Sequence, residues 1–491
     1  MLKVAFIYAP LGHEVFEENL KIVDEDFGRL PPISLAYAAS IAEAAGHEVR
    51  IVDANARRLN VEDVIRELRP FEPDILAFTL TTYMFRQTTR WMRELKMAFG
   101  IPVVAGGINV QLYPAATLTC DAIDYGILHF GVQGLPALLD AIEHGRDPVG
   151  LPEVVARDPN GSVIIGPIDP VPNPYLHMPP PARHLLPNAL YHSIVSQRRN
   201  FTVMVTSTGC PMPCRYCAIP SRPRYRNPID RVMAEIRECH QVHGVREIDF
   251  FDADFFVNRK WSMEFCQRLI DEHLDLEWSC RAGLDRLDRE ILELARKSGC
   301  RQIYVGIETP EPAALSLLRK NLSMDRVRER LQEMRDTGIR ALGFFMIGVP
   351  GETHASALHT IRYALSLPID YAQFSRMIAK PGSDLQKELV ERTGSDYWED
   401  WVRGLPVPSR VPNLWSTIGE DAIEAWTKFA YIAFYYRPGY VLKALGRMRS
   451  ADETWRSART AMRMLGGALH FDRSRKVQSG CEDREDSTTS H

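Results

Sequence analysis

The chain has 491 residues, of which 45% are hydrophobic and 25% are charged, and this balance is typical of a soluble globular protein with two or three domains. The formal net charge of −4 gives no reason to expect a nucleic-acid partner. The N-terminal segment MLKVAFIYAP lacks the features of a signal peptide, and no apolar run reaches the roughly 18 residues of a membrane span, so we expect a cytoplasmic protein.

Residues 1–147 alternate between apolar runs typical of strands, such as KVAFIYA and DILAFTL, and amphipathic segments typical of helices. Because the strand runs are apolar throughout, we expect a parallel sheet covered on both faces, as in a doubly wound (Rossmann-like) domain. Ligands of such domains bind beyond the carboxyl ends of the strands. The loops at residues 9–13, 79–83 and 106–109 would form that edge.

The remaining chain divides into four segments. Residues 148–195 predict a hairpin around Asn160-Gly161 followed by a proline-rich connector. Strand–helix units then repeat through residues 196–390, which predicts a partial (β/α)6 barrel of the TIM type with its chemistry at the carboxyl-end loops. Residues 391–470 predict a helical region, and the polar residues 471–491 predict a disordered tail.

Three cysteines, Cys210, Cys214 and Cys217, follow the first strand of the predicted barrel. Thiolates crowded on one loop suit a soft metal centre. A structural zinc site and an ordinary ferredoxin cluster each use four ligands, and no fourth ligand is evident here. An iron–sulfur cluster with one open iron therefore explains the pattern better than zinc does. The other six cysteines are scattered, so we expect no disulfide framework.

The segment CPMPCRYC resembles the CxxxCxΦC signature of the radical S-adenosylmethionine (SAM) enzymes, with Tyr216 as its aromatic residue. This resemblance implies that Cys210, Cys214 and Cys217 bind three irons of a 4Fe–4S cluster and that the fourth iron binds SAM. It also implies that Tyr216 lies near the adenine of SAM, although a purely packing role is the alternative.

Three further segments resemble later strands of the same enzymes. IDFFDADFF, which contains Asp252 and Asp254, resembles the acidic end of the second barrel strand. YVGIETPEP places Glu308 at a strand end that faces SAM, and FMIGVPGET places Gly348 and Gly351 where backbone approaches SAM closely. A structural ion pair is the alternative for Glu308, and an ordinary turn is the alternative for Gly351.

The order of the two α/β regions resembles the cobalamin-binding branch of the radical SAM family over nearly the whole chain. The segment IPVVAGGINVQLYP matches the family's Gly-Gly turn, and the resemblance implies a cobalamin site at Thr79, Gly106 and Gly107. The family's Asp-x-His-x-x-Gly motif is missing, so we expect no histidine ligand to cobalt and read His13 as an exposed loop residue.

Resemblance to this branch of the family implies a cobalamin-dependent methyltransferase that acts on an unactivated carbon atom. Overall similarity is closest to the hopanoid C-3 methylases, which implies a hopanoid lipid as substrate and a flavodoxin or ferredoxin as electron donor. Two alternatives stay open. One is a radical cyclase or rearrangement enzyme of the anaerobic porphyrin-cyclase type, and the other is a non-enzymatic iron–sulfur or zinc module.

Two segments near the C-terminus bear on the substrate. Apolar residues recur at helical spacing over residues 423–434, which fits a helix that caps the barrel. A second amphipathic helix over residues 453–469 sets apolar residues against Arg456, Arg459 and Arg463. A basic amphipathic helix of this kind predicts peripheral contact with the inner face of an anionic membrane.

Overall fold

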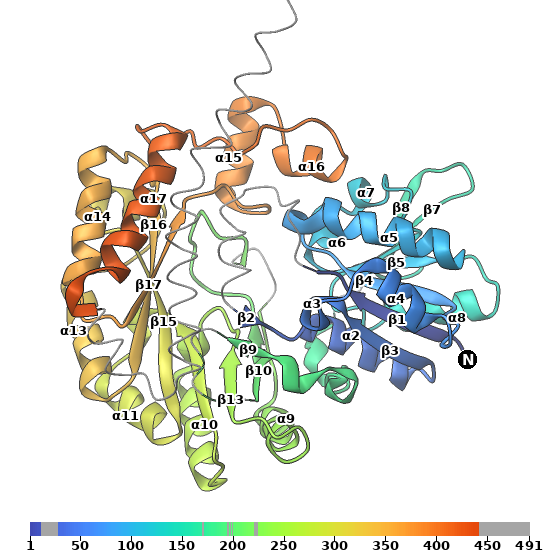
Figure 1. Cartoon of the computed structure of the whole chain (residues 1–491), viewed down its shortest axis with the longest axis horizontal. Helices are drawn as coiled ribbons and strands as arrows, with labels where there is room; N and C mark the ends of the chain where they lie inside the picture. Colours follow the sequence, from blue (N-terminus) through green and yellow to red (C-terminus); the bar gives the residue numbers. More distant parts are fainter. Residues whose placement is uncertain are drawn as a thin grey trace, which may run out of the picture.

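The computed structural model describes residues 1–10, 28–168, 171–193, 196, 198, 200–219 and 224–440 of the chain. Two large sheets lie side by side in Figure 1, one in the blue and cyan part of the chain and the other in its green-to-orange part. The predicted α/β class, with a doubly wound first region and a partial barrel, is confirmed. His13, residues 453–469 and residues 471–491 lie outside the described residues.

The first sheet has the strand order β3-β1-β4-β5-β6-β7-β8. Its first five strands are parallel, and β1 lies between β3 and β4, so the strand order reverses at β1. A reversal of this kind marks the ligand-binding edge of a doubly wound sheet. The strands are β1 (Lys3–Tyr8), β3 (Glu48–Asp53), β4 (Ile75–Thr79), β5 (Val103–Gly106), β6 (Tyr125–Ile127), β7 (Val154–Arg157) and β8 (Val163–Ile165).

Helices cover both faces of this sheet because its strands are apolar on both sides. Val4 and Phe6 of β1 pack in the core beneath α2 and α8, whereas Ala5 and Ile7 pack in the core beneath α4 and α5. The helical elements are α2 (Ile33–Ala44), α3 (Ala54–Arg57), α4 (Val61–Leu68), η1 (Thr82–Met84), α5 (Phe85–Phe99), α6 (Ile108–Leu112), α7 (Pro114–Thr117) and α8 (Gly134–Glu143).

The hairpin of β7 and β8 around Asn160-Gly161 extends the first sheet, since β7 pairs antiparallel with β6. The sheet therefore continues past residue 147, where the sequence pattern divides domain from connector. Val154 and Val155 explain this continuation, because both are buried in the cores of the first sheet. The rest of the connector consists of short elements: η2 (Pro174–Leu176), η3 (Arg183–Leu185), η4 (Asn188–Leu190) and β9 (His192–Ser193), which pairs with β2 (Gly28–Arg29).

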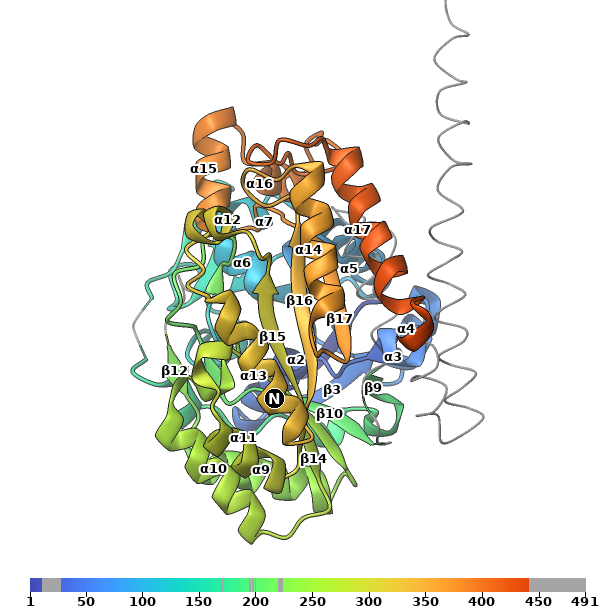
Figure 2. The same ribbon diagram turned by 90° about the vertical axis from the view of Figure 1, so that its left-hand side faces the viewer.

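The second sheet has six parallel strands in chain order, β10-β13-β14-β15-β16-β17. Helices pack on its outer face, as Figure 2 shows for α13 and α14. The strands are β10 (Phe201–Met204), β13 (Glu247–Phe250), β14 (Glu277–Ala282), β15 (Cys300–Glu308), β16 (Arg340–Ile347) and β17 (Tyr371–Arg376), and a small ribbon pairs β11 (Ser207–Thr208) with β12 (Tyr225–Arg226). The helical elements are α9 (Ile229–Gln241), η6 (Phe255–Val257), α10 (Arg259–Asp271), η7 (Leu284–Arg286), α11 (Arg289–Lys297), α12 (Pro312–Leu317), α13 (Met324–Asp336) and α14 (His354–Ser366).

Three helices follow the barrel: α15 (Asp384–Thr393), α16 (Tyr397–Val402) and α17 (Glu420–Tyr435). α17 packs against β17 and α14 and buries Ile423, Ala430 and Phe434, as the capping interpretation expects. Phe429 on its outer side remains 46% exposed. Among the helices of the described residues, none combines the length and apolarity needed to cross a membrane.

Side chains of helix α16 connect the two sheets. Trp401 donates a hydrogen bond from Nε1 to the Thr82 carbonyl at 3.1 Å, and the Arg86 guanidinium lies 3.9 Å from the centre of its ring. Trp398 meets Tyr83 edge to face at 5.0 Å. These contacts place one hydrophobic core across both halves of the chain, so the carboxyl-end loops of the two sheets are held in a fixed relation.

Candidate active site

The cysteine loop begins at the carboxyl end of β10, where Asp252 from the neighbouring strand end holds it. Asp252 is fully buried and accepts hydrogen bonds from the Thr206 amide at 2.7 Å, from the Thr206 hydroxyl at 2.6 Å and from the Ser207 hydroxyl. Burial raises the pKa of Asp252, and these hydrogen bonds oppose the shift. A buried carboxylate that accepts three hydrogen bonds fixes the start of the loop.

The other side of the loop is held by α12 and α15. The Arg215 amide donates to the Leu318 carbonyl at 3.1 Å, and the Leu385 amide donates to the Arg215 carbonyl at 3.0 Å. The Arg215 side chain also pairs with Glu388. The conformation of the segment between Cys210 and Cys217 is therefore set by elements more than a hundred residues away in the sequence.

The three cysteines of the loop are free thiols. Cys214 is buried, whereas Cys210 and Cys217 are partly exposed. Burial raises the pKa of Cys210 and of Cys214, and the Lys320 ammonium opposes this in both cases. Among the described residues, no three Cys, His, Asp or Glu side chains are grouped in an arrangement that could hold a metal ion. Because metal ligation requires the thiolate form of cysteine, a bound cluster would displace the thiol protons. Three soft donors on an anchored loop fit a 4Fe–4S cluster.

Tyr216 and Glu308, both predicted from the sequence, lie in contact. The Tyr216 hydroxyl donates to Glu308 Oε1 at 2.9 Å, and burial, reinforced by the Glu308 carboxylate, raises the pKa of Tyr216. Lys320 donates to the same oxygen at 3.3 Å. Burial disfavours the Lys320 ammonium, but Glu308, Cys214 and Asp285 together outweigh burial and the pKa of Lys320 is raised. Lys320 lies on the loop after α12, and sequence reasoning missed it.

The backbone at Glu308 has φ +68°, which is unusual for a residue other than glycine. The ladder between β15 and β16 shifts register at the same place. Gly306 makes room for the side chain, since a Cβ there would lie 2.3 Å from Glu308 Oε1. Strained backbone of this kind concentrates at functional sites.

Asp254 and Arg286 approach the cysteine loop from the ends of β13 and β14. Burial raises the pKa of Asp254 to about 6, although the Gly283 amide and Arg286 oppose the shift. Among the described residues, Asp254 Oδ1 has no hydrogen-bond partner. Arg286 lies with Nε 3.8 Å from Asp254 Oδ2 and donates from Nη2 towards Met212 Sδ of the loop at 3.7 Å. The resemblance of IDFFDADFF to the second barrel strand of radical SAM enzymes pointed to Asp254, but sequence reasoning missed Arg286.

The two predicted SAM-binding glycines both have local structural partners. Gly348 (φ +87°) donates its amide to Glu352 Oε2 at 2.6 Å, and its carbonyl accepts from Asn413 Nδ2 at 2.7 Å. A Cβ at Gly348 would lie 2.8 Å from that same Asn413 nitrogen. Gly351 (φ +73°) donates to the Trp415 carbonyl at 2.9 Å. Contact of either glycine with SAM stays a prediction.

Thr79, Gly106 and Gly107 meet at the carboxyl edge of the first sheet. Thr79 and Gly106 are paired residues of β4 and β5. Gly107 has φ +96°, and a Cβ there would lie 2.8 Å from both Thr79 Oγ1 and the Leu80 carbonyl oxygen. Nearby in the chain, Thr82 Oγ1 and Asn109 Oδ1 are buried without a partner among the described residues. A close-packed glycine turn beside unsatisfied polar atoms fits a bound group with polar substituents.

The carboxyl-end edges of the two sheets come close to each other at Gly382. A Cβ at Gly382 would lie 2.8 Å from Leu112 Cδ2 and 3.6 Å from the Ala218 Cβ. Leu112 ends the helix that follows Gly107, and Ala218 follows Cys217 directly. Leu112 and Tyr216 also pack against the same hydrophobic core. The glycine turn of the first sheet and the cysteine loop of the second therefore belong to one region of the molecule.

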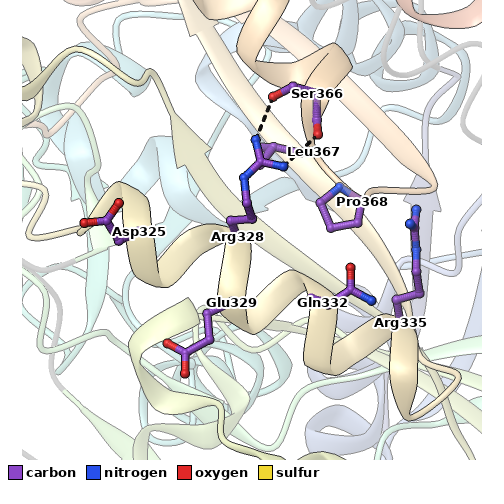
Figure 3. Close-up of a pocket in the computed structure, with 8 residues that line it drawn as sticks. All are labelled: Asp325, Arg328, Glu329, Gln332, Arg335, Ser366, Leu367 and Pro368. Atoms are coloured by element: carbon purple, nitrogen blue, oxygen red, sulfur yellow. Dashed lines mark hydrogen bonds between the residues drawn. The ribbon is translucent and has the colours of Figure 1, made fainter.

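A separate polar pocket of about 530 Å³ lies on the outside of the barrel between α13 and α14 (Figure 3). Arg328 spans it and donates hydrogen bonds to the carbonyl and hydroxyl of Ser366, both at 3.1 Å. The pocket lies on the helices that cover the barrel and includes no predicted site residue.

Comparison with protein families identifies the two halves. The B12 binding domain matches residues 20–139, and the Radical SAM superfamily matches residues 204–364. An uncharacterized methyltransferase of Pyrococcus horikoshii is 30% identical over 84% of this chain and 89% of its own. The chain therefore belongs to the cobalamin-binding radical SAM family, as the sequence resemblance predicted, and its cofactors are a 4Fe–4S cluster, SAM and cobalamin.

More distant relatives differ in their reactions. The anaerobic magnesium-protoporphyrin IX monomethyl ester cyclase of Rubrivivax gelatinosus is 27% identical over 74% of this chain and 67% of its own. The hopanoid C-3 methylase of Methylococcus capsulatus is 23% identical over 90% and 81%. The solved structure of the methyltransferase TsrM from Kitasatospora setae, with cobalamin and a 4Fe–4S cluster bound, has the same fold, with a TM-score of 0.62 over 79% of this chain and 78% of that one at 20% identity.

Proposed function

We propose that the protein is a methyltransferase that places a methyl group on an unactivated carbon atom of its substrate. The observation that carries this proposal is the anchored cysteine loop beside the Tyr216–Glu308–Lys320 group, joined through Gly382 to the edge that carries Gly107. When bound, the cluster and SAM supply a hydrogen-abstracting radical, and cobalamin supplies the methyl group.

In this proposal, Cys210, Cys214 and Cys217 hold the cluster and leave one iron free for SAM. Tyr216 and Glu308 present a fixed hydroxyl and carboxylate beside the loop, and Lys320 balances the charge of Glu308. Glu308 is buried, and Tyr216 and Lys320 are partly buried beside it, which limits contact with water and strengthens their electrostatic effect on a ligand.

The remaining predicted site residues provide backbone surfaces. Gly348 and Gly351 lie in the strand-to-helix turn after β16, where main-chain groups approach SAM. On the opposite edge, Thr79, Gly106 and Gly107 form the flat turn against which the nucleotide tail of cobalamin lies.

The resemblance in sequence to the hopanoid C-3 methylases makes a hopanoid lipid the first substrate to test, and one such methylase is among the distant relatives of this chain. Anaerobically reconstituted protein is incubated with cobalamin, methyl-deuterated SAM, a flavodoxin or ferredoxin reducing system and desmethyl hopanoid. The product is expected to gain a deuterated methyl group, and Cys214→Ala is expected to give neither product nor 5′-deoxyadenosine. Abundant 5′-deoxyadenosine without labelled lipid would reject this substrate, and zinc in place of iron would reject the radical mechanism as well.

A radical cyclase is the second candidate, because the Rubrivivax gelatinosus cyclase is similar over three quarters of this chain. The mass of the product separates the two reactions. Methyl transfer adds one CH2 unit, whereas ring closure by oxidation leaves the number of carbon atoms unchanged.

A cytoplasmic location and contact of residues 453–469 with an anionic membrane remain predictions. Cell fractionation of the full chain and of a chain ending at residue 440 would test both.

A further inference from the structure

The inner face of the second sheet carries charged side chains at mid-height. Side chains alternate along each strand, so Ile248 and Phe250 of β13 pack in the outer core while Asp249 between them points to the opposite face. The same alternation places Arg281 of β14 and Tyr304 of β15 on that inner face. Barrel interiors are usually filled by branched apolar residues. Charged side chains inside a barrel cost free energy unless they pair with each other or bind a ligand.

Among the described residues, one nitrogen of the Arg281 guanidinium group is hydrogen-bonded to the protein, and the other two are not. Its Nη1 donates to Asp249 Oδ1 at 2.5 Å and to the Phe250 carbonyl at 3.0 Å. The guanidinium carbon lies 4.0 Å from the ring centre of Phe251 and 4.5 Å from that of Tyr304. Within the described part of the chain, Nε and Nη2 have no hydrogen-bond partner. Two donors of a rigid guanidinium therefore remain available.

Arg281 and the side chains around it are partly exposed. A quarter of the Arg281 side chain is exposed, and Phe251 at the end of the preceding strand is 37% exposed. Ser375 on the inner face of β17 is exposed, and Gln373 and Phe344 beside it are only partly buried. The inner face thus combines aromatic surface, neutral polar groups and one cation that is held in a fixed orientation.

We propose that Arg281 binds an oxyanion of the substrate, a carboxylate or a phosphate group, within the barrel. A planar oxyanion matches the Nε and Nη2 donors bidentately. The Asp249 pair and the two rings hold the guanidinium ready for it, which lowers the entropy cost of binding. Phe251 and Phe344 would contact the apolar part of the same molecule. This inference rests on the proposed function and deepens it, because it names the substrate as a molecule with an anionic group.

The test uses the full chain with its cluster reconstituted and three probes of one shape: benzoate, phenylphosphonate and neutral benzamide. Equilibrium dialysis is expected to show that at least one anion binds, that benzamide binds more weakly, and that Arg281→Gln weakens the anion at least about tenfold, as loss of a charge-assisted contact does. The preferred anion identifies the substrate group as carboxylate or phosphate. Arg50→Gln is the matched control, because Arg50 also lies over a ring, Phe71, at 4.6 Å but on the other domain.

A second measurement needs no variant and so covers the case in which Arg281→Gln fails to fold. Phenylglyoxal modifies accessible arginines, and peptide mass spectrometry gives the rate at each position. The anion is expected to slow modification of Arg281 and to leave that of Arg50 unchanged. Equal binding of the preferred anion by wild type and Arg281→Gln, binding of benzamide as tight as that of the preferred anion, no anion binding at all, or no protection of Arg281 would each overturn the inference.

These outcomes are separate from those of the methyl-transfer assay, because probe binding requires neither radical chemistry nor turnover. A chain that binds an anion through Arg281 but never transfers a methyl group would reject the proposed function alone. A chain that methylates a hopanoid without any acidic group would reject the anion site alone.

Discussion

At the scale of single residues, the candidate site is a set of buried charges whose partners come from distant strand ends. Glu308 has two partners, Tyr216 and Lys320. Asp254 is less well satisfied, since one of its oxygens lacks a partner among the described residues and burial raises its pKa to about 6. A carboxyl group in such surroundings makes stability depend on pH in a direction opposite to that of a salt-bridged carboxylate.

The Asp254→Asn variant tests this dependence. Because the pKa of Asp254 is higher in the folded chain than its ordinary value of 3.8, the folded state binds the proton more tightly. Its stability therefore falls as pH rises from about 4 to about 6 and is constant above. Asparagine cannot ionise, so this pH dependence disappears in the variant. The free energy of unfolding of the variant relative to that of wild type is therefore expected to rise by about 1 kcal/mol from pH 5 to pH 7.

Urea unfolding of wild type and of Asp254→Asn at several pH values between 5 and 7 measures this difference in stability. Asp336→Asn is the control and is expected to track wild type, because Asp336 is exposed on α13 and is not among the groups that shift the pKa of Asp254. A stability difference between Asp254→Asn and wild type that does not change with pH would show that Asp254 is not protonated in the folded chain near pH 6.

At the scale of elements, hydrophobic periodicity was enough to predict the strands of both sheets, because each parallel strand is an uninterrupted apolar run or alternates cleanly. The same pattern predicted the hairpin around Asn160-Gly161 but not its pairing with β6, since edge pairing depends on tertiary contacts. The resemblance of CPMPCRYC and YVGIETPEP to segments of radical SAM enzymes pointed to Tyr216 and Glu308. Lys320 and Arg286 carry no such local signal, because only folding brings them to the cysteine loop.

Strand β15 supplies a prediction at this scale through Gly306. A Cβ there would lie 2.3 Å from Glu308 Oε1 and 2.9 Å from Lys320 Nζ. Both atoms are the ends of flexible side chains, so Gly306→Ala is expected to keep the fold while it displaces the ion pair. If the pair binds SAM, the dissociation constant for SAM rises roughly tenfold through loss of a charge-assisted contact.

Equilibrium dialysis of SAM against the reconstituted protein gives this constant, and circular dichroism checks the fold. Gly419→Ala is the control, since Gly419 has φ −71° and open space where the Cβ would stand. Unchanged SAM affinity in a folded Gly306→Ala chain would remove Glu308 and Lys320 from the proposed SAM site.

At the scale of the whole molecule, the proposed reaction depends on two domains that each carry a different cofactor. SAM cleavage requires only the cysteine loop and its neighbours in the barrel. Methyl transfer also requires the edge at Gly107 to stay opposite that loop. The contacts of α16 with η1 and α5 hold this arrangement, so weakening them should separate the two activities.

Trp401→Ala is the variant that weakens these contacts. The indole is buried, bonds to the Thr82 carbonyl and stacks under Arg86, so its loss is expected to cost about 3–5 kcal/mol of stability. Trp261→Ala is the matched control, because Trp261 stacks on Phe265 at 5.5 Å within the barrel itself. We expect Trp401→Ala to form 5′-deoxyadenosine but little methylated product, whereas Trp261→Ala should keep the wild-type ratio of the two. If both variants retain that ratio, the α16 contacts do not control the alignment of the cofactors, and the coupling of the domains must reside in the core around Leu112 and Gly382 instead.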